Sequence, residues 1–264
     1  MQPIAIFGVT GRMGQALLSA LRGSSTLRLC GAAASSASAR LGQDAASDGK
    51  ATGVPVTADP RLAIRGAVVA VDFSLNTCVA AHAQACAAAG VALVVGATDL
   101  DAVGRSALEQ AARNIPVLVA PNLSVGVSVV AKLVAVAAAG LGPSYDVEIF
   151  EAHHRLKRDA PSGTALALGE VVAQARSVPL QDVAIFGRAG QTALRTPGSI
   201  GFASMRAGDI AGDHTVIFAS AGERVEITHR ATDRSTFAQG ALRAAEWLIG
   251  QPAGLYGMQD VLGL

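Results

Sequence analysis

The 264-residue sequence lacks the composition of several protein classes. Charged residues make up only 16%, against about 25% in average globular chains, whereas hydrophobic residues make up 51%. The chain therefore has enough apolar residues to form a core, which excludes an intrinsically disordered protein. The net charge of +1 provides no basic field to hold nucleic acid, and the aromatic content of 4% argues against a surface on which bases stack. We expect no nucleic-acid partner.

Cysteine is scarce as well. Cys30, Cys78 and Cys86 are too few, and of odd number, for a disulfide framework, and none lies in the C-x-x-C spacing of many zinc and iron–sulfur sites. Unpaired thiols suit a reducing compartment. The N-terminal stretch PIAIF has neither a basic leader nor a cleavage-site pattern. We therefore expect a cytoplasmic protein that holds no metal.

Long uncharged hydrophobic runs are also missing. The most membrane-like stretch, residues 124–142, carries Lys132 near its middle and is rich in alanine and glycine, which insert weakly into lipid. A buried helix is the better interpretation of this stretch, and we expect no membrane partner.

The first half of the sequence alternates between two patterns. Short β-branched runs are typical of buried parallel strands, and helical patterns separate several of them. The predicted strands are residues 3–7, 27–32, 67–73, 91–96 and 115–120, and the predicted helices are 12–21, 77–89 and 100–113. This alternation predicts an α/β fold with a Rossmann-like, doubly wound parallel sheet.

The second half has a different pattern. Strand-like runs follow one another with short turns and no helix between them, which indicates an antiparallel sheet. These runs are residues 199–206, 213–219 and 224–229. We expect an α+β domain with a mostly antiparallel sheet at 124–235. The domain with the parallel sheet would be residues 1–123, and the C-terminal segment 236–264 would return to it.

A glycine-rich turn lies between the first predicted strand and the first predicted helix. Gly8, Gly11 and Gly14 have the spacing GxxGxxG, which is one residue longer in its first gap than the usual dinucleotide-binding motif. In that motif the first glycine permits a tight turn, the second lets the backbone approach a pyrophosphate, and the third lets the helix pack on the strand. The start of the helix offers N–H groups to the phosphates. The alternative is a turn whose glycines serve packing alone.

The acidic residue that usually binds the adenosine ribose is absent. It is expected at the end of the second strand, where this chain has the sequence AASS at 33–36. No carboxylate there repels a 2′-phosphate, and the hydroxyls of Ser35 and Ser36 can donate hydrogen bonds to it, with Arg12 and Arg40 as counter-charges. We expect both NADPH and NADH to work, with a modest preference for NADPH.

The most informative stretch is EAHHRLKRDAPSGTALALGE, residues 151–170. Two histidines, three basic residues and two acids fall within nine residues at the end of an apolar strand, just before a helix. A helix start behind basic residues suits carboxylates, and a histidine beside it suits proton transfer. Zinc binding by His153 and His154 is disfavoured because adjacent residues of a strand point to opposite faces. A merely polar surface loop remains the other alternative.

The stretch EAHHRLKRDAPSGTA closely resembles the signature of the 4-hydroxy-tetrahydrodipicolinate reductase family, also called dihydrodipicolinate reductases. The resemblance covers nearly the whole chain, through GVTGRMG, VDFS, GATD, PNLSVGV, IGFASMRAGDIAGDHTVIFA, GERVEITHRATDRSTFAQGA and GLYGMQDVL. It implies NAD(P)H-dependent reduction of a cyclic imine dicarboxylate in lysine and diaminopimelate biosynthesis. It also implies a homotetramer formed through the sheet of the second domain. More apolar residues alternate in those strands than one helix can cover: Ile200, Phe202, Val216, Phe218, Val225 and Ile227.

The resemblance also implies roles for individual residues. His153 would be the general acid–base residue with Lys157 as its partner, and His154, Gly163 and Thr164 would bind substrate. The cofactor would be held by Gly8, Val9, Thr10, Gly11, Arg12, Met13, Gly96, Ala97, Thr98, Ala120, Pro121, Asn122 and Leu123, with Ser35 and Ser36 near its ribose. The departures from the family pattern all fall on the cofactor side, at Ala97, Asp99, Leu123 and 35–36.

Two other functions remain open from the sequence. A different imine or aldehyde dehydrogenase on the same two-domain plan would explain the glycine turn but not the signature. A non-catalytic nucleotide-binding or redox-sensing protein would not need His153 and Lys157 beside the start of a helix.

Overall fold

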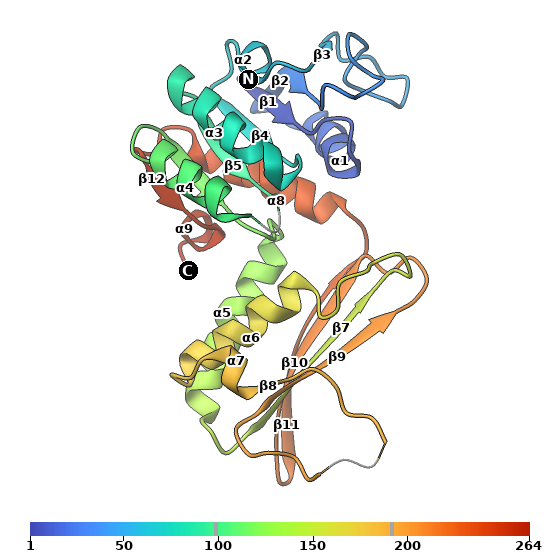
Figure 1. Cartoon of the computed structure of the whole chain (residues 1–264), viewed down its shortest axis with the longest axis vertical. Helices are drawn as coiled ribbons and strands as arrows, with labels where there is room; N and C mark the ends of the chain where they lie inside the picture. Colours follow the sequence, from blue (N-terminus) through green and yellow to red (C-terminus); the bar gives the residue numbers. More distant parts are fainter. Residues whose placement is uncertain (98–99, 191–192) are drawn as a thin grey trace. The chain divides into compact units, whose positions relative to one another are not determined.

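The computed structural model describes residues 1–97, 100–190 and 193–264. The chain divides into two compact units, one formed by Met1–Val125 with Arg234–Leu264 and the other by Gly126–Asp233 (Figure 1). Among the described residues, no helix combines the length and the apolar character that crossing a bilayer requires.

The first unit is built on a sheet of seven strands in the order β12-β6-β5-β4-β1-β2-β3, all of them parallel. The strands are β1 (Gln2–Phe7), β2 (Leu27–Ala33), β3 (Val56–Thr57), β4 (Val69–Asp72), β5 (Ala92–Val95), β6 (Pro116–Val119) and β12 (Gly254–Tyr256). Apart from the added β12, this is the 3-2-1-4-5-6 order of doubly wound dinucleotide-binding sheets, which confirms the predicted fold class. The strand order reverses between β1 and β4, next to the glycine-rich turn.

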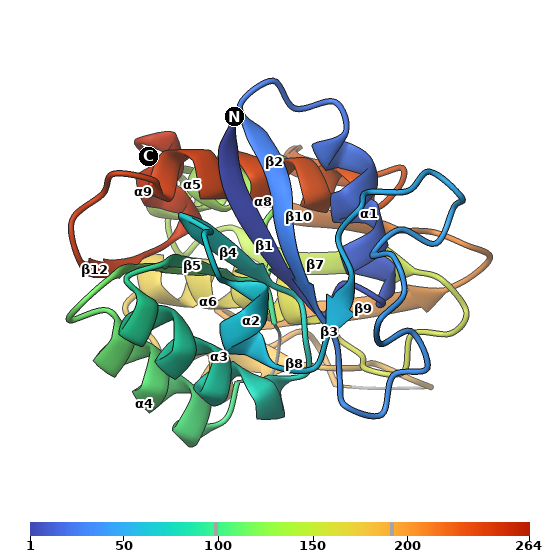
Figure 2. The ribbon, with the colours of Figure 1, turned by 90° about the horizontal axis from the view of Figure 1, so that it is seen from above.

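Helices cover both faces of this sheet (Figure 2). Successive residues of a strand point to opposite faces, so Ile4 and Ile6 enter one core while Ala5 and Phe7 enter the other. The first core is closed by α1 (Arg12–Leu21), α8 (Ser235–Leu248) and α9 (Met258–Leu262). The second is closed by α2 (Pro60–Ala63), α3 (Asn76–Ala89) and α4 (Ala102–Ala111).

The second unit has five strands in the order β11-β10-β7-β9-β8. Its elements are α5 (Val125–Leu141), β7 (Asp146–His153), α6 (Gly163–Ala175), α7 (Leu180–Val183), β8 (Ala184–Ile185), β9 (Ile200–Arg206), β10 (Gly212–Ser220) and β11 (Glu223–Ala231). β10 is antiparallel to β7 and β11, but β9 is parallel to β7 and β8, so the sheet is mixed. The long pairings of β10 with β7 and β11 agree with the predicted mostly antiparallel sheet, whereas the parallel pairings of β9 were not foreseen. The chain crosses over through α6 before it enters β9, and β7 lies between β9 and β10.

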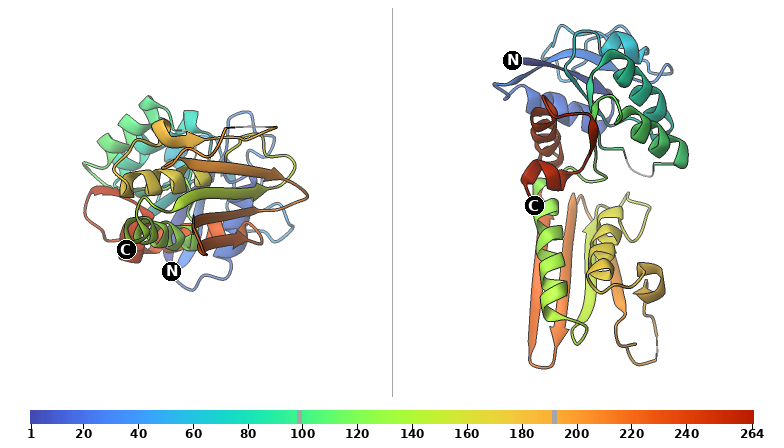
Figure 3. Two further views of the ribbon diagram at one scale, coloured as in Figure 1. Left: turned by 90° about the horizontal axis from the view of Figure 1, so that it is seen from below. Right: turned by 90° about the vertical axis from the view of Figure 1, so that its left-hand side faces the viewer.

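Both α5 and α6 pack on one face of this sheet (Figure 3). Four of the apolar residues expected at an interface between subunits, Ile200, Phe202, Val216 and Phe218, are instead buried in this core. The opposite face carries other apolar side chains, with Phe150 36% exposed and Met205 41% exposed. Two helices, not one, cover the first face, which explains the incorrect choice of residues.

The helix-covered face changes from apolar to ionisable residues toward one end of the strands. On β7, Val147 and Ile149 lie in the apolar core, and the next residues with the same alternation are Glu151 and His153. The sheet therefore delivers a buried carboxylate and a buried histidine at the end of its own core.

Candidate active site

Two of the three glycines in the turn after β1 are required by the packing of the chain itself. Gly8 has a positive φ of 74°, and a Cβ there would lie 2.7 Å from the carbonyl oxygen of Phe73. A Cβ on Gly14 would lie 2.4 Å from the carbonyl oxygen of Gly8. A side chain at either position would separate the turn from its neighbours.

Gly11 has no such packing requirement. Its φ of −76° is ordinary, and the nearest atom to a Cβ there would be the Gly8 carbonyl oxygen at 3.3 Å. No side chain of the described residues caps the start of α1, and its first turn contains no acid. An uncapped helix start behind a glycine fits a phosphate group, because the backbone can be approached closely there. The residues present therefore suit the pyrophosphate of a dinucleotide.

The loops that follow β4, β5 and β6 meet around Phe73. A Cβ on Gly96 would lie 2.4 Å from Phe73 Cε1 and 2.9 Å from Leu123 Cδ1, so both side chains pack directly on Gly96. The carboxyl ends of parallel strands are where open α/β sheets bind ligands. The structure thus brings Gly8, Gly96 and Leu123 to one edge of the sheet. Thr98 and Asp99, also singled out in the sequence, lie outside the described residues.

Several of the expected cofactor residues can offer only backbone groups to a ligand. The buried ones are Val9, Ala97, Ala120 and Leu123. Arg12 and Pro121 are exposed, whereas Thr10, Met13 and Asn122 are half-buried. Ala97 and Pro121 also line a mostly apolar cavity of about 320 Å³, together with Leu100, Leu108, Val119 and Leu255.

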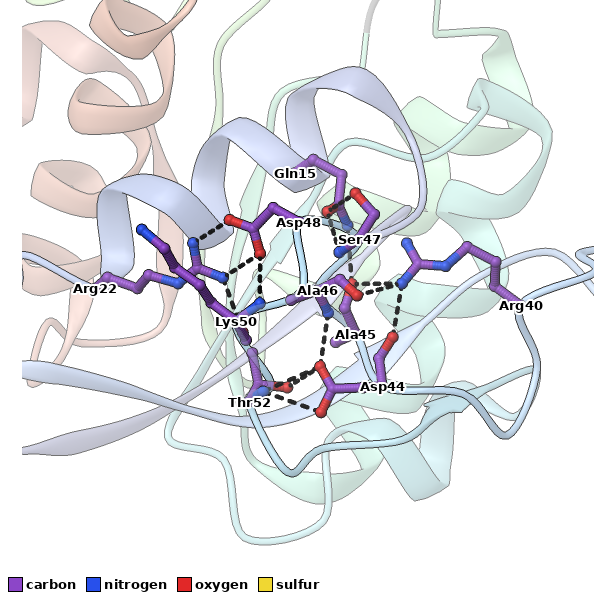
Figure 4. A network of polar contacts seen from close by, with 10 residues as sticks. All are labelled: Gln15, Arg22, Arg40, Asp44, Ala45, Ala46, Ser47, Asp48, Lys50 and Thr52. Carbon is purple, nitrogen blue, oxygen red and sulfur yellow. Dashed lines mark hydrogen bonds and ion pairs between the residues drawn. The ribbon is translucent and has the colours of Figure 1, made fainter.

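The segment after β2 is held together by a polar network (Figure 4). Ser35 and Ser36 are exposed, as a role beside the ribose requires. Arg40 Nη2, however, donates to the carbonyl oxygens of Asp44 at 2.7 Å and Ala46 at 2.6 Å. The guanidinium of Arg40, which we expect to act as a counter-charge, is thus hydrogen-bonded to its own loop.

Gln15 joins this loop to the glycine-rich turn (Figure 4). Its Nε2 donates to the carbonyl oxygens of Val9 at 2.8 Å and Ala45 at 2.9 Å, and its Oε1 accepts from the backbone N–H and the hydroxyl of Ser47. Asp44 accepts hydrogen bonds from the backbone of Thr52 and neighbouring residues, and these bonds lower its pKa to about 2. The Asp44 carboxylate therefore holds these residues of the loop in place. The loop beside Ser35 is thus fixed to the turn expected to hold phosphates.

In the second unit, His153 ends β7 as part of a buried chain of charged groups. Its Nδ1 lies 2.5 Å from Oε2 of Glu151, and both oxygens of Glu151 accept from Arg206, at 2.9 Å from Nη1 and 2.7 Å from Nη2. Burial raises the pKa of Glu151, but hydrogen bonds from Arg206, Ser204 and His153 outweigh it and lower the pKa to about 2. Glu151 is therefore a carboxylate, and Nδ1 of His153 must donate to it.

The second ring nitrogen of His153 is the one left for chemistry. A Cβ on Gly212 would lie 3.1 Å from His153 Nε2, so any side chain at this position would crowd that nitrogen. Burial lowers the pKa of His153, Glu151 raises it again, and Lys157 and Arg206 lower it, which leaves it below its ordinary value. A bound dianion would raise it, since a nearby negative charge favours imidazolium.

The residues after β7 place further charges and donors near the start of α6. Lys157 Nζ lies 2.7 Å from Oδ2 of Asp159, and the half-buried His154 accepts the N–H of Leu156 at 3.2 Å through its Nδ1. Ser162 caps α6 by accepting the N–H of Ala165 at 3.2 Å. Gly163 and Thr164 then form the first turn of that helix.

Comparison with known proteins settles the family. Models of the dihydrodipicolinate reductase N-terminus and C-terminus match residues 2–123 and 126–262. The chain belongs to the dihydrodipicolinate reductase family. A 4-hydroxy-tetrahydrodipicolinate reductase from Thiobacillus denitrificans is 52% identical over 99% of this chain and 98% of its own, and one from Anaeromyxobacter dehalogenans is 48% identical over 100% and 98%. The solved dipicolinate-bound dihydrodipicolinate reductase from Paenisporosarcina sp. TG-14 has a TM-score of 0.78 over 98% of this chain and 99% of its own, at 24% identity.

As a member of the dihydrodipicolinate reductase family, the chain is an NAD(P)H-dependent oxidoreductase of lysine and diaminopimelate biosynthesis. Its activity is the reduction of the cyclic imine dicarboxylate, and its cofactor is NADH or NADPH. The family signature was thus interpreted correctly, and the two other functions considered from the sequence are excluded. In the part of the chain that the structure describes, no group of histidine, cysteine and acidic residues could hold a metal ion.

Sequence reasoning missed four residues of the reductase that surround His153. Glu151 was detectable, because residues two apart on a strand share a face. Arg206, Gly212 and His214 come from β9 and β10, and only the pairing of these strands with β7 brings them to His153. No local pattern in the sequence indicates how β9 and β10 pair with β7.

Proposed function

We propose that the first unit binds NAD(P)H at the carboxyl edge of its sheet, and that the second unit binds the dicarboxylate and supplies the proton. The observation that carries this proposal is the buried chain Arg206–Glu151–His153, which leaves only Nε2 of the histidine for a substrate. The corresponding functional domains are residues 1–123 with 236–264, and residues 124–235. We place the enzyme in the cytoplasm.

The substrate's two carboxylates call for two sets of donors. We assign one to the N–H groups of Gly163 and Thr164 at the start of α6, and the other to His154 and Lys157. Lys157 lies in an exposed ion pair with Asp159, and exposed pairs contribute only about 0–1 kcal/mol. A substrate carboxylate can therefore replace Asp159 at little cost.

Loss of water from the 4-hydroxy substrate leaves a C=C bond conjugated with the imine. Bound NAD(P)H would supply a hydride to one carbon of that bond, and the neighbouring carbon must then receive a proton. His153 delivers it from Nε2 while Nδ1 stays hydrogen-bonded to Glu151, which stabilises the imidazolium before transfer. Lys157 supports the donation by holding the carboxylate and by its positive charge.

The direct test is oxidation of NADPH and NADH by the purified protein with freshly generated 4-hydroxy-tetrahydrodipicolinate. We expect turnover with both cofactors that depends on the substrate. Cofactor oxidation that does not depend on the substrate would contradict the proposal that the second unit binds the dicarboxylate and supplies the proton.

Thr164→Val should raise the KM for the dicarboxylate more than it lowers kcat. The contact to a carboxylate exists in both the ground state and the transition state, so its loss weakens both about equally. Steady-state kinetics with varied substrate at saturating NADPH measure the effect. An unchanged KM would remove Thr164 from the site.

Ser35→Asp should reverse the modest preference for NADPH. A carboxylate there would bind the ribose hydroxyls of NADH and repel a 2′-phosphate. The wild-type preference should shrink as salt rises, because it rests on exposed charge. The measurement is kcat/KM for both cofactors at low and high salt, with the uncharged Ser35→Asn as the matched control. A clear wild-type preference for NADH would show that a residue outside this loop decides the choice.

We expect a homotetramer that associates through the uncovered face of the second sheet. Phe150 and Met205 are exposed there, and half-buried Ile217 lies on the same face. Light scattering should give about four times the chain mass of 26.5 kDa, and Phe150→Glu should lower it. A stable wild-type monomer at micromolar concentration would refute this prediction.

A further inference from the structure

His214, on β10, is bonded to the residue that caps α6. Its Nε2 lies 3.0 Å from Oγ of Ser162, and both residues are buried. The hydroxyl oxygen of Ser162 already accepts the N–H of Ala165 at 3.2 Å. The hydroxyl has its hydrogen and a second lone pair left, so a single hydrogen bond joins it to Nε2 of His214 in either neutral tautomer of the ring.

The same imidazole touches the ring of His153. The two ring centroids lie 5.1 Å apart with an interplanar angle of 73°, an edge-to-face contact. In the strand register, His214 lies between Glu151 on β7 and His229 on β11. One neutral side chain thus contacts both the proposed acid and the cap of the proposed carboxylate site.

The charged groups around His214 keep it neutral. Burial lowers its pKa most, His153, His229 and Lys157 lower it further, and Glu151 raises it, with a result of about 3. Arg206 also lies on this face, paired with Glu151. His214 is therefore uncharged near neutral pH.

We propose that His214 is a positioning residue: through its hydrogen bond to the Ser162 hydroxyl, it holds the first turn of α6 in a fixed relation to the His153 ring. This proposal rests on the proposed function, in which that turn binds a substrate carboxylate and His153 gives the proton. His214 itself transfers no proton and touches no substrate.

The kinetic test compares His214→Phe, which keeps a ring but removes the hydrogen bond, with His214→Gln, whose amide can accept from or donate to the Ser162 hydroxyl. His214→Phe should raise the KM for the dicarboxylate roughly 2- to 10-fold, the usual effect of one net hydrogen bond, and leave the KM for NADPH unchanged. His214→Gln should recover most of the loss. Equal KM values in His214→Phe and the wild type would overturn the proposal.

A double-mutant cycle isolates the bond itself. Ser162→Ala should raise the same KM, and the double variant with His214→Phe should be no worse than the poorer single variant. Effects that multiply would overturn the proposal. Ser199→Ala is the matched control, because Ser199 is another buried serine of this unit with a hydrogen bond to the backbone, at 2.7 Å from the Thr196 carbonyl oxygen. It should leave both KM values unchanged.

A readout without turnover separates this proposal from the proposed function. Histidine 15N NMR of the wild-type protein should show a neutral His214 ring that does not titrate between about pH 5.5 and 8. A titration in this range would overturn the positioning role. An unchanged KM in Thr164→Val would instead contradict the proposed carboxylate site, while the NMR result would still decide the state of His214.

Discussion

Replacement of His153 by alanine should lower kcat by about 10²–10⁴-fold, the usual contribution of a general acid. The side chain ends a buried strand, and its Nδ1 is committed to Glu151, so its Nε2 is the nitrogen that gives the proton in the proposed function. The KM for NADPH should stay nearly constant, because His153 belongs to the second unit. Steady-state kinetics with each substrate varied in turn give kcat and both KM values.

As a control, thermal unfolding and dicarboxylate binding of His153→Ala are each compared with those of the wild type. Removing a buried ring can lower the melting temperature, but the variant should still bind dipicolinate, a dicarboxylate that resembles the product ring. Near-normal turnover in a folded variant would show that another group gives the proton.

The two cores of the first unit were predictable because they depend on local patterns. Strand and helix periodicity located most of the elements of the Rossmann-like sheet, and the helix predicted at 12–21 matches α1. Very short elements were not found. β3 has only two residues and β12 only three, too few for alternation to be visible.

The second unit shows where sequence reasoning stops. β9 and β10 follow one another with a short connection, a pattern that ordinarily indicates a hairpin, yet β7 lies between them. That arrangement depends on the crossover through α6, and it is also what brings Arg206 and His214 to β7. The histidine and lysine of the signature could be recognised from the sequence, whereas the groups that set the protonation of that histidine could not.

Glu151→Gln is the second change for which we expect a large effect. A glutamine can accept from His153 Nδ1 only with its NH₂ group turned toward Nη2 of Arg206, which is itself a donor. In the opposite orientation, the NH₂ group faces Nδ1 and Nη1. Either arrangement removes the negative charge next to the ring and leaves Arg206 with one acceptor of this side chain instead of two and no opposite charge. A lower melting temperature is therefore expected, because breaking a buried ion pair is destabilising.

The pH dependence identifies the catalytic part of the Glu151→Gln effect. Glu151 raises the pKa of His153 against the effects of burial, Lys157 and Arg206, so its neutralisation should lower that pKa further. The protonated form of His153 is then lost at a lower pH, and the limb of kcat/KM that reports it should move toward acid. At neutral pH kcat should fall roughly 10- to 100-fold, the effect of one hydrogen bond to a charged group. NMR titration of His153 in both proteins measures the shift directly. An unchanged or raised pKa would show that Glu151 supports the fold but not the proton transfer.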